Sequence, residues 1–197
     1  MNFKETRAVA SNPTTSTDTL TRLSTHTNAT VRADVAANLS TPVRVLLELL
    51  SDVDPWVAAS ALTHPSMPVD VLTVFAVNGD WLQAGTLAFN PNLPEAVIEV
   101  LATHSHPVVR QLVTQNHPLP AHLFPTLVKD TNRSVRHEIA RSGHTPDVVF
   151  VVLTDDSDPL VQSTAENSMV RKPSAPVESL TMTRPWLIAL LEEGGVE

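Results

Sequence analysis

Residues 90–94 read NPNLP and residues 116–120 read NHPLP, so an Asn stands four residues before a Pro twice, at an interval of 26 residues. The same interval continues in both directions along the chain. The column that contains Asn90 holds Asn12, Asn38, His64, Asn90, Asn116, Ser142 and Ser168. Four positions later, five successive repeats carry Pro42, Pro68, Pro94, Pro120 and Pro146. An unbroken interval of this kind indicates a repeat architecture.

Each repeat is predicted to contain two helices. In VRADVAAN (31–38), the apolar residues Val31, Val35 and Ala36 lie on one helical face, and TPVRVLLELLSD (41–52) shows a second stripe of the same spacing. The Pro is expected in the first turn of the second helix, where its missing N–H costs nothing. The Asn is expected to end the first helix, either by bonding a free backbone group or by adopting a left-handed turn.

A unit of 26 residues buries too little apolar surface to fold alone, so its stripes must be shared with neighbouring units. The chain is therefore predicted to be an all-α solenoid of about seven repeats in one domain, 1–197, with repeats over 4–172 and a cap over 173–197. TRPWLIALLEEGG (183–195) suggests a final helix. Its apolar residues are expected either to cover the last open core or to form a homodimer contact; they are Trp186, Leu187, Leu190 and Leu191.

The composition restricts the chemistry of the protein. Hydrophobic residues make up 42% of the chain and aromatic residues only 4%, so the core must consist of Leu, Val, Ile and Ala. The absence of Cys excludes disulfides and thiolate sites. The N-terminal stretch has no apolar signal segment, and no apolar run approaches the length of a membrane span. These features predict a soluble, cytoplasmic protein.

The repeat resembles the leucine-rich repeat variant family and, more distantly, HEAT repeats. The residues that carry the resemblance are Pro42, Leu46, Leu49, Asp52, Asp54, Pro55, Val135, Arg136, Ile139 and Ala140, and it extends over about 4–172. It implies a right-handed, all-α superhelix without a sheet, which offers a surface to a partner. Some members carry an iron–sulfur segment held by Cys. That cofactor cannot be carried over to a chain without Cys.

No set of residues predicts catalysis or a metal site. RHEIARSGH (136–144) has Arg141 where a zinc-binding helix would need its second His. His104 and His106 lie in a predicted loop, and their columns elsewhere hold Asp52 and Asp54, so turn capping explains them better than zinc binding. The protein is therefore predicted to be a non-enzyme without cofactor or metal.

The predicted function is a scaffold that binds another protein. Large apolar side chains stand in columns that are otherwise small or polar, which is typical of a binding surface, although local adjustment of the core is the alternative. Arg32, Arg110 and Arg136 share a column, either as a binding stripe or as a structural ladder with loop Asp residues. The predicted partner-binding residues are Arg32, Trp56, Trp81, Phe89, Arg110, Leu112, Arg136, His137 and Arg141.

Nucleic-acid binding is the alternative function. The net charge of −8 disfavours it, but residues 106–172 are locally balanced, with seven basic and seven acidic side chains. The residues that would contact phosphates are Lys129, Arg133, Arg136, Arg141, Arg171 and Lys172.

Overall fold

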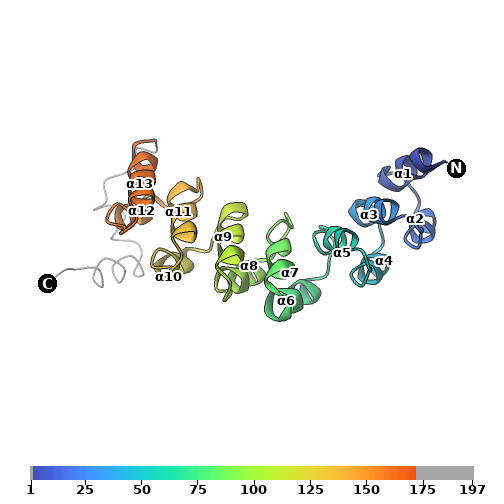
Figure 1. Ribbon diagram of the computed structural model, residues 1–197, viewed down its shortest axis with the longest axis horizontal. Coiled ribbons are helices and arrows are strands. Elements are labelled where there is room, and N and C mark those ends of the chain that lie inside the picture. Colours follow the sequence, from blue (N-terminus) through green and yellow to red (C-terminus); the bar gives the residue numbers. More distant parts are fainter. Residues whose placement is uncertain (1, 172–197) are drawn as a thin grey trace. The chain divides into compact units, whose positions relative to one another are not determined.

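The computed structural model of the protein describes residues 2–171. Those residues form thirteen α-helices and one short 3-10 helix, with no β-strand among them (Figure 1). The chain divides into two compact units, Met1–Val97 and Ile98–Glu197. The predicted all-α repeat fold is thereby confirmed, whereas one continuous domain over 1–197 and a right-handed superhelix stay predictions.

Each repeat contributes two helices, which we call the A helix and the B helix. The A helices are α1 (Phe3–Ser11), α3 (Ala29–Ala37), α5 (Pro55–Leu62), α7 (Trp81–Leu87), α9 (Pro107–Asn116), α11 (Arg133–Arg141) and α13 (Pro159–Arg171). The B helices are α2 (Thr17–Leu23), α4 (Val43–Leu49), α6 (Val69–Asn78), α8 (Glu95–Ala102), the pair η1 (Ala121–Leu123) and α10 (Phe124–Leu127), and α12 (Asp147–Leu153). Their starting residues recur every 26 positions, as the sequence predicts. The predicted cap, with Trp186, Leu187, Leu190 and Leu191, lies outside the described residues.

Polar residues in the loops fix where the A helices begin. Asn28, Asp54 and Asn132 each accept, through a side-chain oxygen, a hydrogen bond from the backbone N–H two residues further on. Asp80 accepts one from the backbone N–H of Gln83. These bonds satisfy donors that the first turn of a helix leaves free.

The B helices begin after the proline, so the prediction that Pro lies in the first helical turn was wrong. Pro42, Pro68 and Pro146 are N-cap residues with φ between −62° and −60° and an extended ψ. The pyrrolidine ring favours this φ, and the carbonyl of Pro42 still accepts hydrogen bonds from the backbone N–H groups of Val45 and Leu46. The proline therefore starts the helix from outside it.

The core comes from the apolar columns of both helix types, as predicted. On the A helices, Val31, Val57, Val109, Val135 and Val161 are at most 1% exposed. The corresponding B-helix positions are also buried: Leu20, Leu46, Leu72, Ile98, Phe124 and Phe150. Two residues depart from the pattern in neighbouring repeats. Gln83 of the A-helix column is exposed, and Phe75, in a further B-helix column with Leu49 and Leu101, is only half-buried.

Side chains of the column that contains Asn38 and Asn90 join neighbouring repeats through hydrogen bonds. Asn38 Nδ2 donates to the carbonyl oxygens of Ala10 and Asn12, at 2.7 and 2.9 Å, in the preceding repeat. Asn90 Nδ2 donates likewise to the carbonyl oxygen of His64. The alternative of a left-handed turn was wrong, because no residue of the described chain has a positive φ and Asn38 is extended. The Asn38 side chain instead reaches back to main-chain carbonyl oxygens of the preceding repeat.

His64 replaces Asn in this column and is only 2% exposed. Its Nε2 lies 3.1 Å from the carbonyl oxygen of Asn38, and the backbone N–H of Ser66 donates to its Nδ1 at 3.0 Å. These two partners assign the neutral tautomer with its proton on Nε2. Burial lowers the pKa of His64, and the hydrogen bond to Asn38 opposes that effect only in part.

Consecutive A helices pack against each other within each unit, but one junction is open. The pairs α1–α3, α3–α5, α9–α11 and α11–α13 are in close contact, whereas α5 touches α7 much less and α7 packs chiefly on α6. Helix α6 has ten residues and continues to Asn78, while α4 and α12 have seven. The longer α6 thus coincides with a wider junction between α5 and α7.

Candidate partner-binding surface

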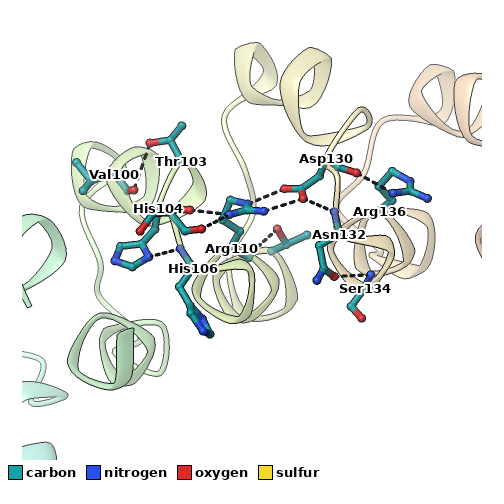
Figure 2. Close-up of polar contacts among 11 residues, drawn as sticks. Val100, Thr103, His104, His106, Arg110, Asp130, Asn132, Ser134 and Arg136 are labelled. Carbon is teal, nitrogen blue, oxygen red and sulfur yellow. Dashed lines mark hydrogen bonds and ion pairs between the residues drawn. The ribbon is translucent and has the colours of Figure 1, made fainter. Parts of the chain in front are cut away.

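A ladder of arginine and aspartate side chains connects the loops between repeats. Arg110 donates from Nε and Nη2 to the two carboxylate oxygens of Asp130 at 2.6 and 2.8 Å, and from Nη1 to the carbonyl oxygen of His104 at 2.7 Å. Arg136 donates from Nη1 to the carbonyl oxygen of Asp130, which places one aspartate between two arginines (Figure 2). Arg136 also holds both carboxylate oxygens of Asp156, at 2.7 and 2.9 Å.

The first unit contains the same pair, since Arg32 donates to both carboxylate oxygens of Asp52 at 2.6 and 2.7 Å. The hydrogen bonds from Arg32 lower the pKa of Asp52. Burial alone would raise the pKa of Asp130 and Asp156. The arginines and backbone N–H donors that face these carboxylates have the larger, opposite effect, so the pKa of each lies below its ordinary value and both are ionised.

Arg32, Arg110 and Arg136 therefore form the structural ladder rather than an open stripe. Their side chains are only 12–14% exposed, and each guanidinium is held in place by an aspartate and by a carbonyl of the preceding loop. We therefore exclude them from the candidate surface.

The histidines of the loop act locally. His104 Nδ1 accepts a hydrogen bond from the backbone N–H of His106 at 3.0 Å, which is the predicted turn-capping arrangement (Figure 2). Within residues 2–171, no group of three or more His, Cys, Asp or Glu side chains is placed to hold a metal ion. The helices of this part of the chain are also too short or too polar to cross a membrane.

Predicted aromatic residues meet in the first unit. Trp56 on α5 is 75% exposed, and Phe89, which follows α7, is 59% exposed. Together with Ser60, Thr63 and Thr86 they line a hollow of about 420 Å³. Trp81, the first residue of α7, is 49% exposed.

A second hollow of about 530 Å³ shares Trp56, Ala59 and Thr86 with the first. Its lining also includes Ala58 and the carboxylate-bearing residue Asp80. We call the two hollows together the α5–α7 groove. It is an open, largely apolar surface with acidic residues at its edge, and it lies wholly within residues 50–89.

The other predicted partner-binding residues belong to the second unit. Leu112 is half-buried on α9, and His137 on α11 lines a small hollow of about 90 Å³ beside Asp158. Arg141 Nη2 donates to Glu138 Oε2 at 2.7 Å. The nine predicted residues are therefore divided between two units, and three aromatic members of the set lie in the first.

The residues of the nucleic-acid alternative are largely paired with carboxylates. Arg133 Nη1 donates to Asp158 at 3.2 Å, and Arg136 and Arg141 hold the partners given above. Lys129 and Arg171 are exposed, and Lys172 lies outside the described residues. Each of these three guanidinium groups faces a carboxylate, which offsets its charge, whereas phosphate binding favours a face of net positive charge.

Comparison of the sequence with family models and with curated proteins gave no match. Comparison with solved structures finds a leucine-rich repeat variant with a novel repetitive structural motif, at a TM-score of 0.59 and 24% identity over 82% of this chain. The chain has the fold of a leucine-rich repeat variant. It spans 64% of that protein's length. An engineered protein is also similar, at a TM-score of 0.43 and 20% identity over 95% of this chain and 67% of that one.

Within this leucine-rich repeat variant fold, sequence reasoning missed several residues of the groove. Ala58 stands where the second, fifth and sixth repeats have the ladder Arg, although Ala84 and Gln162 interrupt the same column in other repeats. Gln83 stands where five other repeats have a core Val, and Asp80 caps α7. Each departure looks minor alone. Their signal is that all of them fall at one junction, between repeats three and four.

Proposed function

We propose that the protein is a non-enzymatic scaffold that binds another protein through the α5–α7 groove. The observation that carries the proposal is the exposure of Trp56 and Phe89 on the two sides of one hollow. Exposed aromatic side chains around a concave apolar surface are typical of protein-binding sites, and tryptophan is enriched among residues that dominate binding energy. The fold supports this role, since repeat scaffolds present long surfaces to partners.

Site-specific photo-crosslinking in the source cells tests the proposal. A photoreactive amino acid at Ser60, which lines the groove, is expected to capture a protein, and the same amino acid at Glu48, exposed on α4, is not. Combined Trp56→Ala and Phe89→Ala substitutions should lower the Ser60 product at least about tenfold. Both side chains are mostly exposed, so the helical circular dichroism spectrum should stay unchanged.

Equal capture from Ser60 and Glu48, or capture that the double substitution leaves intact, would refute the proposal. A product that nuclease reduces to about the mass of the chain alone would instead support the nucleic-acid alternative. The dependence of its yield on salt concentration during irradiation would then report the number of phosphate contacts.

A further inference from the structure

The junctions between consecutive A helices within a unit share a feature that α5–α7 lacks. An arginine–carboxylate pair links α1 with α3, the α3 repeat with the loop before α5, α9 with the loop before α11, and α11 with the loop before α13. The pairs are Arg7–Asp34, Arg32–Asp52, Arg110–Asp130, Arg136–Asp156 and Arg133–Asp158. Among the described residues, no such pair links α5 with α7.

The α11–α13 junction shows what is missing, because each of its residues has a counterpart 78 positions earlier. Arg136 corresponds to Ala58, and Arg133 corresponds to Pro55. The carboxylate that Arg133 contacts, Asp158, corresponds to Asp80. The carboxylate that Arg136 holds, Asp156, corresponds to Asn78. The α5–α7 junction thus keeps one of the two carboxylates, at Asp80, and lacks the other carboxylate and both guanidinium groups.

The space that the arginines would fill is open. The hollow at α11–α13 measures about 90 Å³, whereas its counterpart at α5–α7 measures about 530 Å³ and is lined by Ala58 and Asp80. Gly79 caps the C-terminal end of α6 beside this hollow, and a Cβ at this position would collide with the carbonyl oxygen of Phe75.

Two oxygen acceptors remain at the edge of this hollow. Asp80 uses Oδ1 to cap α7, at 2.8 Å from the backbone N–H of Gln83, which leaves Oδ2 available within the described chain. The carbonyl oxygen of Asp52 corresponds to that of Asp130, which accepts from Arg136 in the complete ladder. The Asp52 carboxylate, in contrast, is already held by Arg32.

The charge around the groove matches a basic occupant. Residues 45–97 contain no Lys or Arg and six acidic residues, Glu48, Asp52, Asp54, Asp70, Asp80 and Glu95. An exposed Trp56 beside the hollow adds an aromatic face, on which a guanidinium stacks favourably.

We propose that the α5–α7 groove binds an arginine side chain of the partner protein, in the space that corresponds to Arg133 and Arg136 at the α11–α13 junction. The guanidinium bonds Asp80 and the carbonyl of Asp52, while neighbouring apolar residues of the partner cover Trp56 and Phe89. Arginine fits better than lysine because the complete junctions present acceptors to a planar group with several donors. This proposal rests on the proposed function and names the chemistry of its partner.

A short peptide tests the proposal without knowledge of the partner. The probe is acetyl-Gly-Leu-Arg-Leu-Gly-amide, with a control peptide that carries the uncharged isostere citrulline in place of Arg. Titration into the full chain, followed by amide NMR, is expected to shift the resonances of Ala58, Asp80 and Gln83. The Arg peptide should bind at least about tenfold more tightly than the citrulline peptide.

Two substitutions separate the site from general charge effects. Asp80→Asn keeps a capping oxygen for α7 but removes the charge, and it should abolish the preference for Arg over citrulline. Ala58→Arg should fill the hollow from within and weaken the Arg peptide by a similar factor. Leu39→Arg adds the same charge at a position that is 68% exposed and outside the groove, and it should leave binding unchanged.

Equal binding of the two peptides, or equal loss in Leu39→Arg and Ala58→Arg, would overturn the proposal. So would a dimer in sedimentation experiments that dissociates in Asp80→Asn, since a second copy would then occupy the groove. Capture from Ser60 that needs Trp56 and Phe89 but is unaffected by Asp80→Asn would leave the scaffold function standing and refute the arginine alone.

Discussion

Replacement of Asn38 by Ala should destabilise the protein far more than the same replacement of Asn116, although both belong to one sequence column. Asn38 is 4% exposed, donates to the carbonyl oxygens of Ala10 and Asn12, and accepts from the backbone N–H of Ser40. Asn116 is exposed and donates only to the carbonyl of Leu112 in its own helix, at 3.0 Å.

The magnitude follows from these bonds. Each intramolecular hydrogen bond contributes about 1 kcal/mol net, and an acceptor left buried without a partner costs about 1–3 kcal/mol. Asn38→Ala removes three bonds and strands the carbonyl of the fully buried Ala10, so a loss of about 3 kcal/mol in the free energy of unfolding is expected. For Asn116→Ala, a loss below about 1 kcal/mol is expected, because water replaces an exposed bond.

Urea unfolding followed by far-UV circular dichroism measures both values. Amide hydrogen exchange shows which helices lose stability. Because stability in repeat arrays depends on contacts between nearest neighbours, Asn38→Ala should accelerate exchange in α1 and α2 before it affects the second unit. Similar losses for the two variants would show that the Asn column merely caps its own helix, and would refute the inter-repeat role.

Three further predictions concern other contacts. Burial holds the pKa of His64 below its ordinary value, so the unfolded chain binds a proton at His64 more readily than the folded chain does. The free energy of unfolding should therefore fall as the pH drops from about 7 to about 5. His64→Asn offers the same kinds of donor and acceptor without titrating, and in urea unfolding it should abolish that fall. Arg136→Ala should lower the free energy of unfolding by about 3 kcal/mol and Arg141→Ala by less than about 1 kcal/mol. The reason is that the Arg136 side chain is 12% exposed and that of Arg141 is 54% exposed. Equal losses in the two variants would contradict a structural role for the ladder. Gly79→Ala should lower the free energy of unfolding by about 1–3 kcal/mol, because its Cβ would collide with the carbonyl oxygen of Phe75. Gly143→Ala should have almost no effect, since a Cβ there meets no atom within 4 Å. Thermal unfolding of the two variants measures the difference.

The sequence predicts the helices well because their spacing depends on local rules. Apolar residues at helical intervals, such as Val31 and Val35, must share one face, and a 26-residue interval leaves room for two short helices. The buried columns and the starting residues of the helices were therefore predictable from the chain alone. The position of Pro42 was predicted one step too far inside its helix, since the ring's φ suits both an N-cap and a first turn.

Contacts between repeats were harder to predict, because the sequence gives residue types but not directions. The ladder needed a partner for Arg136, and Asp156 and Asp158 stand two residues apart in the same loop. The structure selects Asp156, since Asp158 is taken by Arg133 and also caps α13. Similarly, the recurring 26-residue spacing of the Asn38 column shows its register but not that the Asn38 amide reaches the preceding repeat.

The groove illustrates why departures from a repeat carry more information than the repeat itself. In a linear array each junction contributes separately to stability, so one weak junction can persist while its neighbours hold the chain together. The α5–α7 junction has Ala58 in place of the ladder arginine, Asn78 in place of the ladder aspartate and Gln83 in place of a core valine. Local violations of otherwise consistent packing are expected at functional sites. Three such departures at one junction are the ground on which the proposed arginine site rests.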